Sequence, residues 1–144
     1  MKGNLLKLQD LPKNSQWCDK DHVMLCACFQ LLVDFIEKEK PDKIIDIKRH
    51  REQKRIWEEL KSLYRYWKVE RPQLEKKNTV LLMKWGKKHK TKWVPDPDGR
   101  ASTLVTLSTD KKAFRRLNRA ELKFEELGSQ MLHRLIRVRK HLWC

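Results

Sequence analysis

Glycine is scarce in this chain of 144 residues: its four glycines stand apart from one another, and proline occurs only five times. Phosphate-binding loops need closely spaced glycines, because their backbone must approach the phosphate oxygens. The chain also lacks the Gly-x-Ser-x-Gly motif of serine hydrolases and the His-Glu-x-x-His motif of zinc proteases. We therefore predict a protein that is not an enzyme and has no catalytic residues.

Long apolar runs are absent as well. No run approaches the roughly 20 apolar residues of a membrane-spanning helix, so we expect no membrane contact. The N-terminus has only a broken apolar stretch and no small-residue cleavage site, so we expect no signal peptide. The four cysteines lack the spacing of a secreted disulfide framework, which favours a reducing, cytoplasmic setting.

Positive charge is abundant and unevenly distributed. The chain carries 34 Lys and Arg against 19 Asp and Glu, a net charge of +15, while residues 1–47 have a net charge of −1. The excess therefore lies entirely in residues 48–144. A hydrophobic content of 40%, with six tryptophans, still supplies enough apolar side chains for a folded core. This charge distribution predicts a polyanion such as nucleic acid, or an acidic protein surface, as the partner, and a merely solvated basic surface is the alternative.

Two amphipathic segments predict a helical hairpin over residues 19–69. In residues 19–40 the apolar residues recur at three- and four-residue steps, which predicts one buried face that Pro41 ends. These residues are Met24, Leu25, Cys28, Phe29, Leu32, Phe35 and Ile36, with Leu31 and Val33 widening the face. In residues 48–69 the stripe consists of Ile56, Leu60, Leu63 and Trp67, flanked by Trp57 and Tyr64, and Pro72 is expected to end this second helix. The short connection predicts that the two helices pack antiparallel.

Residues 73–107 form a basic insert that allows two interpretations. Three short strands are possible, at Thr79–Trp85, Thr91–Val94 and Thr103–Leu107, the first two pairing across residues 86–90. Alternatively, Leu74, Leu81 and Trp85 share a helical face between Pro72 and Gly86. We favour an irregular insert or a small β-hairpin, with Pro95–Gly99 as a loop in either case.

Residues 110–143 are predicted to be helical again, with Gly128 and Ser129 dividing them into two helices. The fold class expected from the whole pattern is mainly α: a domain of three or four helices with one insert. We expect a single domain over residues 1–144, made of the hairpin, the insert and the C-terminal helices.

Two groups of basic residues are the candidate nucleic-acid site. The first surrounds aromatic residues, which suits single strands or RNA because lysines meet phosphates while a base stacks on an indole. It comprises Lys84, Lys87, Lys88, Lys90, Lys92 and Trp93. The second group follows the C-terminal helices and comprises Lys112, Arg115, Arg116, Arg119, Arg134 and Arg137. For the first group the alternative is a solvated loop anchored by its tryptophans, and for the second it is the wet side of an amphipathic helix. Trp85 is expected to be the core anchor and Trp93 the contact residue.

Metal and cofactor sites are not expected. Cys18, His22 and Cys26 follow one helical face at four-residue steps, but zinc needs four converging ligands, so we interpret these residues as core packing. Asp96 and Asp98 resemble the opening of a calcium loop, yet the later ligands are missing, and a turn is the better interpretation.

Two stretches of the chain resemble small uncharacterised helical proteins of tailed bacteriophages. The first runs from Trp17 to Glu37 and contains Phe-Gln-Leu-Leu-Val-Asp-Phe-Ile-Glu, and the second is Arg-Leu-Ile-Arg-Val-Arg-Lys-His-Leu-Trp near the C-terminus. Residues 66–72 also resemble the second helix of such proteins. The resemblance implies a phage origin and a helical fold, and with them the host cytoplasm or the virion as the location. It implies no activity and no site residues.

The expected function is therefore binding rather than catalysis. The leading hypothesis is a phage-encoded protein that engages RNA, DNA or a nucleoprotein assembly through its basic surface. The alternative is a protein–protein module, either a virion component or an inhibitor of a host defence or polymerase complex, whose charge meets an acidic protein surface.

Overall fold

The computed structural model describes residues 6–11, 18–44, 46–47 and 49–142. It forms two compact units. Unit 1 comprises residues 1–71 and 127–144, and unit 2 comprises residues 72–126. The sequence-predicted helix start at Lys48 and the motif residues Trp17 and Trp143 lie outside the described residues.

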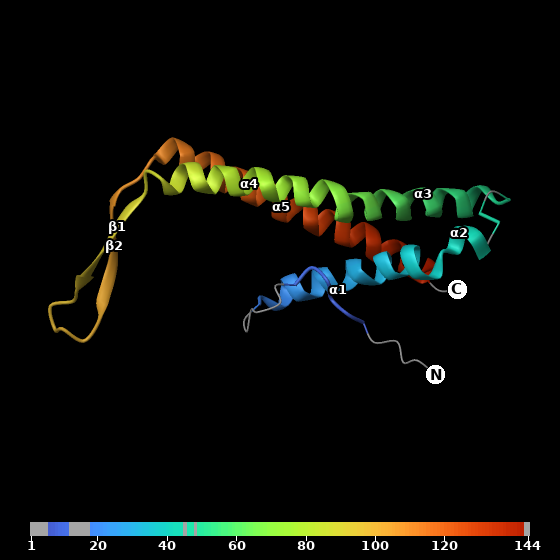
Figure 1. Ribbon diagram of the computed structural model, residues 1–144, viewed down its shortest axis with the longest axis horizontal. Helices are drawn as coiled ribbons and strands as arrows, with labels where there is room; N and C mark the ends of the chain where they lie inside the picture. Colours follow the sequence, from blue (N-terminus) through green and yellow to red (C-terminus); the bar gives the residue numbers. More distant parts are fainter. Residues whose placement is uncertain (1–5, 12–17, 45, 48, 143–144) are drawn as a thin grey trace. The chain divides into compact units, whose positions relative to one another are not determined.

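Unit 1 begins with the predicted helical hairpin (Figure 1). Helix α1 (Lys20–Asp34) continues into a π-helical segment, η1 (Phe35–Glu39), and a short helix α2 (Pro41–Ile44) follows. Helix α3 (Arg51–Arg65) continues into a second π-helical segment, η2 (Tyr66–Glu70). The Tyr64 hydroxyl donates to Glu37 over 2.7 Å and the Phe29 ring stacks on Trp67 at 4.4 Å between centroids. The later position in the first helix, Glu37, thus meets the earlier position in the second, Tyr64, while Phe29 meets the later Trp67, and the antiparallel arrangement is confirmed.

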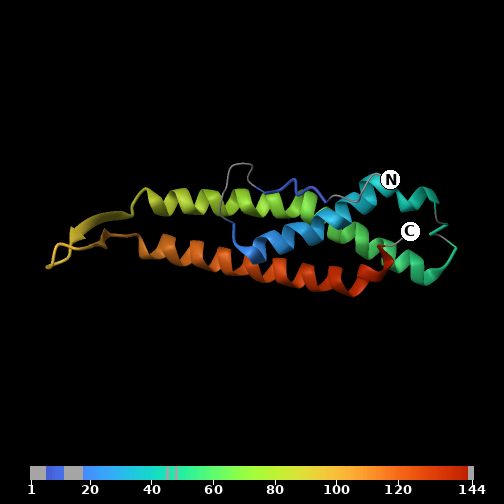
Figure 2. The same ribbon diagram turned by 90° about the horizontal axis from the view of Figure 1, so that it is seen from below.

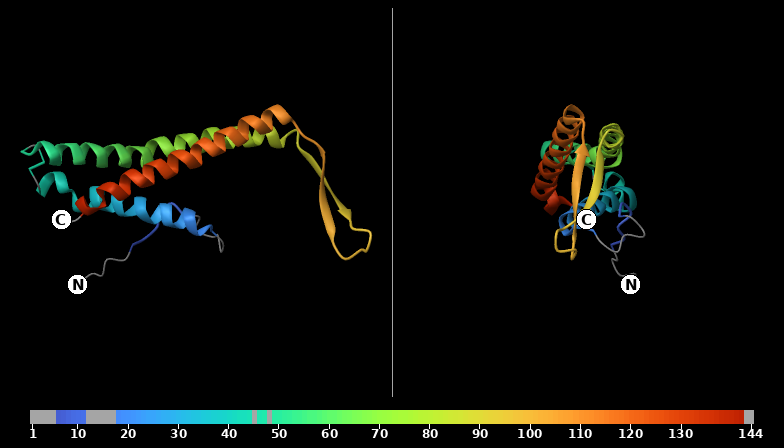
Figure 3. Two further views of the ribbon diagram at one scale, coloured as in Figure 1. Left: turned by 180° about the vertical axis from the view of Figure 1, so that it is seen from behind. Right: turned by 90° about the vertical axis from the view of Figure 1, so that its left-hand side faces the viewer.

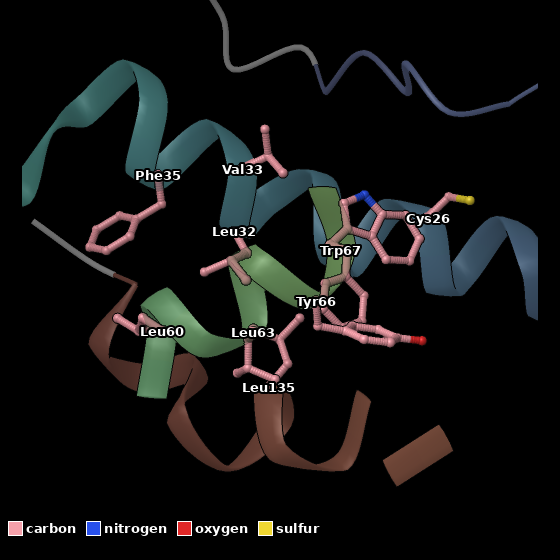
Figure 4. Packing of buried hydrophobic residues seen from close by; sticks show 10 residues of the cluster. Cys26, Leu32, Val33, Phe35, Leu60, Leu63, Tyr66, Trp67 and Leu135 are labelled. Carbon is pink, nitrogen blue, oxygen red and sulfur yellow. The ribbon is translucent and has the colours of Figure 1, made fainter. Parts of the chain in front are cut away.

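The core of unit 1 joins three helices that are far apart in the sequence. The close-up in Figure 4 shows Leu32 and Phe35 facing Leu60 and Leu63, with Leu135 entering from the end of α5 (Lys111–Val138). Phe29, Leu32 and Leu63 have no exposed surface at all. Full burial of one such side chain contributes about 1.5–3 kcal/mol to folding. The predicted stripe of Leu60, Leu63 and Trp67 is confirmed as buried, and Ile56 is half-buried beside it.

The buried face of α1 differs from the predicted one. Met24 and Leu31, which were expected to be buried, are 56% and 52% exposed, while Cys26 and Gln30 are buried. Met24 and Leu31 are seven residues apart and so share a stripe that turns away from α3. Gln30 is tolerated in the core because both ends of its side-chain amide are hydrogen-bonded. Its Nε2 donates to Asp34 at 2.9 Å, and its Oε1 accepts the backbone N–H of Gln9 at 3.3 Å.

Pro72 does not end the second helix, contrary to the prediction. Helix α4 (Arg71–Gly86) begins directly after η2, with Arg71 still in right-handed helical geometry. Proline is tolerated in the first turn of a helix, where its missing N–H leaves no bond unmade. Before Pro72 the backbone hydrogen bonds already follow the π-helical pattern of η2 instead of the α-helical one.

Unit 2 contains α4 from Pro72 onward, one β-hairpin and the first part of α5. The strand predicted at Thr79–Trp85 is wrong: these residues lie in α4, which ends at Gly86 as the helical alternative expects. The strands are β1 (Lys90–Pro95) and β2 (Ser102–Ser108), which pair antiparallel around the confirmed loop at Asp96–Gly99 (Figure 3, right). The end of α4 and the start of α5 lie side by side in Figures 1 and 2.

Helix α5 runs through Gly128 without the predicted break. Gly128 is buried, and a Cβ atom built there would lie 3.6 Å from Nη1 of Arg71 and 3.8 Å from the Tyr66 hydroxyl oxygen. These are ordinary contact distances, so Gly128 lies packed inside unit 1 and does not end a helix. A 3₁₀ turn, η3 (Arg139–His141), follows α5. The described residues thus form three long helical stretches and one small antiparallel hairpin, a mainly α fold with three helices rather than four.

Candidate nucleic-acid interface

A depression of about 390 Å³ lies in unit 2 where α4 ends and α5 begins. Five cationic side chains surround it, and one carboxylate, Asp110, is the only acidic group among its lining residues. The cations are Lys84, Lys87, Lys88, Lys112 and Arg116, and Leu81 and Ala113 complete the lining. We call this group the basic depression. It unites residues from both of the basic groups that the sequence singled out.

The cations of the basic depression lie at opposite ends of two helix dipoles, at the C-terminus of α4 and the N-terminus of α5. Lys84 lies in the last turn of α4 and Lys87 follows directly, and cations there complement the negative end of the helix dipole. Lys112 lies in the first turn of α5, which contains no acidic residue, and Arg116 lies a turn further on. A cation in the first turn faces the positive end of the dipole, so Lys112 lowers the stability of its own helix. The position of Lys112 therefore does not stabilise helix α5.

Asp110 holds the start of α5 in place. Its Oδ1 accepts the backbone N–H groups of Lys112 and Ala113 at 3.1 and 3.0 Å, which is the N-cap arrangement. Its Oδ2 lies 3.4 Å from Nζ of Lys88. The hydrogen bond from the Ala113 amide, followed by that from Lys88, lowers the pKa of the Asp110 carboxyl below its ordinary value. One carboxylate thus serves both the helix start and one of the five cations.

The remaining four cations of the basic depression form no ion pair with any residue that the structure describes. Their side chains are exposed. Such a group of uncompensated charges attracts anions, and its mutual repulsion falls when an anion binds.

Trp85 anchors the turn that leads into the hairpin. Its indole N–H donates to Thr109 Oγ1 at 3.0 Å, and its ring stacks on His89 at 4.3 Å and lies 5.8 Å from Phe114. Trp85 is half-buried, whereas Trp93 is 64% exposed. Thr109 and Asp110 are not among the residues predicted for the site, although an aspartate at the start of a predicted helix is a known capping signal.

The hairpin separates the other residues of the first basic group. The register places Lys92 opposite Val105 and Trp93 opposite Leu104. Side chains alternate between the faces of a strand, so Lys92 and Trp93 lie on opposite faces of the hairpin. Lys90, at the start of β1, is exposed next to a register shift between Lys90 and Thr91.

The second basic group is also divided. Arg115 and Arg119 are exposed on α5 in unit 2, outside the lining of the basic depression. Arg134 lies in unit 1, where its Nε and Nη2 donate to the two carboxylate oxygens of Glu59 at 2.6 and 2.7 Å. The Arg134 guanidinium holds the pKa of Glu59 below its ordinary value. Arg137 is exposed in unit 1 and forms no ion pair with another described residue.

The cysteines of α1 are part of the packing of unit 1. Cys26 is buried, and its sulfur lies 3.6 Å from Nε2 of His22. Burial raises the pKa of the Cys28 thiol. Among the described residues no group of three His, Cys, Asp or Glu side chains is placed to hold a metal ion. No helix in the same part of the chain is long and apolar enough to cross a membrane.

Five of the twelve predicted site residues therefore meet at one place, three lie on the hairpin start, and four lie elsewhere on α5. The basic depression offers what a multiply charged anion requires, namely several cations and little competing negative charge. No protein-family model, no curated protein and no solved structure matches this chain.

Proposed function

We propose that this chain is a non-enzymatic binding protein that engages nucleic acid through the basic depression. The observation that carries the proposal is the convergence of five cations from two helix ends around a single carboxylate. The placement of Lys112 in the first turn of α5, where it opposes the helix dipole, supports a role in binding rather than in stability.

The charge around the basic depression favours a polymer of phosphates over a single small anion. Residues 84–119 contain eleven Lys and Arg but only three Asp, a net charge of +8. Lys90 and Lys92 extend the basic surface along β1, and Arg115 and Arg119 extend it along α5. Each phosphate that such a surface neutralises releases condensed counterions, which drives association and makes it depend on salt.

The first test is a binding titration of the full chain on labelled single-stranded RNA, single-stranded DNA and duplex DNA at two ionic strengths. We expect affinity to fall steeply as salt rises. Changing Lys84, Lys87 and Lys112 together to Gln removes three phosphate contacts. It should lower the slope of log K against log salt by about 2–3, since each contact contributes about 0.7–0.9.

A matched variant separates the basic depression from net charge. Lys76, Lys77 and Lys123 are exposed lysines of unit 2 that do not line the basic depression. Changing these three to Gln removes the same charge from the same unit. The proposal requires this control to bind almost as the unchanged chain does. Equal weakening by both triple variants, or an absence of binding at low salt, contradicts the proposal.

The two tryptophans allow a second test of how a nucleic acid is held. Removing the exposed Trp93 with Trp93→Ala should cost about 1–3 kcal/mol of single-strand binding if a base stacks on the indole. Trp85→Ala should instead lower the stability of unit 2, because it removes the contacts to Thr109, His89 and Phe114. Thermal melts beside binding curves distinguish the two results. An unchanged affinity in Trp93→Ala places the contact at the basic depression alone.

A second candidate function is protein binding, and the exposed apolar residues of unit 2 favour it. Leu104 and Leu107 on β2 and Met83 on α4 are each at least half exposed. The chain would then be either a virion component or an inhibitor of a host defence or polymerase complex, and its charge would meet an acidic protein surface. The resemblance to tailed-phage proteins supports such a setting, in the infected cytoplasm or the virion. A partner that stays bound in stoichiometric amount after nuclease treatment would favour this function over the first.

A further inference from the structure

The hairpin of unit 2 is exposed on both faces. All residues of β1 and β2 are exposed, and the sheet has two strands only among the described residues. The apolar side chains on it include Trp93, Val94, Leu104 and Val105, each at least 40% exposed. A two-stranded hairpin with nothing packed against it is at best marginally stable in water. The hairpin therefore has surface that association would stabilise.

The two free edges of the hairpin differ in chemistry. Strand β1 carries Lys90 and Lys92 and ends at Pro95, and lysine and proline are the residues that protect a sheet edge from further pairing. Strand β2, Ser-Thr-Leu-Val-Thr-Leu-Ser, has no charge, no proline and no glycine, and its residues favour strands. Only the β2 edge is open to another strand.

We propose that β2 pairs with β2 of a second copy of this chain, in antiparallel orientation, to make a four-stranded sheet across a two-fold axis. This inference is independent of nucleic-acid binding. The axis lies at Leu104, the middle of the regular stretch Ser102–Thr106, because the register shift near Lys90 leaves Leu107 as an extra residue. Ser102 then faces Thr106 and Thr103 faces Val105, so every pair across the axis is uncharged.

This register produces one continuous apolar row across the sheet. Trp93 lies opposite Leu104 within each hairpin. With the axis at Leu104, the row across the four strands becomes Trp93, Leu104, then Leu104 and Trp93 of the second copy. Apolar and aromatic neighbours on adjacent strands stabilise a sheet by about 0.2–1 kcal/mol per pair. A register moved by one residue would place Leu104 opposite Thr103 or Val105 of the second copy. Leu104 of the second copy would then point to the other face of the sheet, and the apolar row would be lost.

The positions of the charges favour pairing of two copies through β2 over pairing through β1, although each chain has a net charge of +15. The lysines of β1 lie on the outer strands of the four-stranded sheet, three strand spacings apart, or about 14 Å. That separation exceeds the Debye length of about 8 Å at physiological ionic strength. Pairing through the β1 edges would instead bring Lys90 and Lys92 of the two copies together. A nucleic acid, by contrast, would favour the lysine edge and leave β2 open.

The test is the oligomeric state of the full chain by sedimentation velocity, from micromolar to near-millimolar concentration. We expect the unchanged chain to form dimers as concentration rises. Leu104→Lys and Leu104→Glu each place like charges directly opposite each other at the axis and should raise the dimer Kd by about tenfold or more. An equimolar mixture of the two variants should regain the dimer, because opposite charges then meet.

Leu107→Lys is the matched control. It makes the same exchange in the same strand at a leucine that is 62% exposed, compared with 50% for Leu104, but outside the paired stretch. It should dimerise as the unchanged chain does. A monomer at all concentrations overturns the proposal, as does a Leu104→Lys variant that dimerises with an unchanged Kd or a mixture that dimerises no better than the single variants. Circular dichroism checks that each variant remains folded, and recovery in the mixture cannot arise from unfolded chains.

Discussion

Units 1 and 2 differ in how far their apolar side chains are buried. Of the eleven buried hydrophobic residues among the described ones, ten lie in unit 1, and Leu117 alone lies in unit 2. Of the sixteen large hydrophobic residues that are exposed in the described part of the chain, ten lie in unit 2. Burial of apolar surface is the main favourable term in folding, so unit 1 supplies most of the stability that the described chain can have. Unit 2 keeps its apolar and basic side chains available for partners.

The largest difference in stability between the two units is expected when one phenylalanine in each is truncated. Phe29 is fully buried in unit 1 and packs on the Tyr66 and Trp67 rings, whereas Phe114 in unit 2 is 48% exposed. Phe29→Ala should lower the free energy of unfolding by about 3–5 kcal/mol. Phe114→Ala should cost about 1 kcal/mol or less. Denaturant unfolding of both variants measures the difference, and equal losses would show that unit 2 has a core of its own.

A smaller effect is expected at the ion pair that joins the end of α5 to α3. Glu59→Gln weakens the two-point contact with Arg134 and should cost about 1 kcal/mol, because both side chains are about one-third exposed to screening water. The matched control is the neighbouring Glu58→Gln, whose partner Lys61 is a surface residue three positions away. That control should change stability by less than about 0.5 kcal/mol.

The same pair predicts a pH dependence with a defined sign. The pKa of Glu59 is lower in the folded chain than in the unfolded chain, because Arg134 donates to it. Its contribution is therefore complete above the ordinary glutamate pKa of about 4.3 and is lost as pH falls through the lower folded value. The stability difference between the unchanged chain and Glu59→Gln should shrink in acid. A difference that is constant from neutral pH to strong acid would contradict this origin.

The smallest effect concerns the backbone. Lys40 in unit 1 and Gly99 in unit 2 both have positive φ, at 51° and 68°. Lys40→Gly should raise the free energy of unfolding by about 0.5–1 kcal/mol, because only glycine adopts this geometry without strain. Gly99→Ala should loosen the hairpin by a similar amount while leaving the core of unit 1 unchanged. Hydrogen exchange, read separately on α3 and on β1, locates each change.

Two tripeptides explain why the helix boundaries were only partly predictable. Glu39-Lys40-Pro41 and Glu70-Arg71-Pro72 have the same pattern, and each begins with the last residue of a π-helical segment. Lys40 turns to the left-handed region and its helix ends, whereas Arg71 stays right-handed and the helix continues. Arg71 is 7% exposed and its guanidinium lies 5.0 Å from the centre of the Trp67 ring. Local sequence favours a stop at both prolines, and the exception is accompanied by the burial of Arg71 and its contact with Trp67, four residues earlier in the same helical stretch.

The remaining errors have similar causes. The run Val80–Met83 is apolar on all sides, so its periodicity does not distinguish a strand from a helix. Gly128 lies buried in the middle of α5 beside Arg71 and Tyr66, residues more than fifty positions away, and this packing is not visible in the local sequence. For the candidate site, the sequence identified the cations but not their grouping. Lys87 and Lys112 meet because the hairpin returns the chain to the end of α4, and the register of that hairpin separates Lys92 from Trp93.

The division of unit 1 along the chain determines the order in which it can form during synthesis. Its contacts join residues 1–71 to residues after 126, and Glu59 and Arg134 are 75 positions apart. A ribosome that adds 5–20 residues per second needs about 4–15 s to travel between them. During that interval the nascent helices α1 and α3 lack Leu135, whereas unit 2, an unbroken stretch of chain, already has all its parts. The segment with the least core is therefore complete before the better packed one.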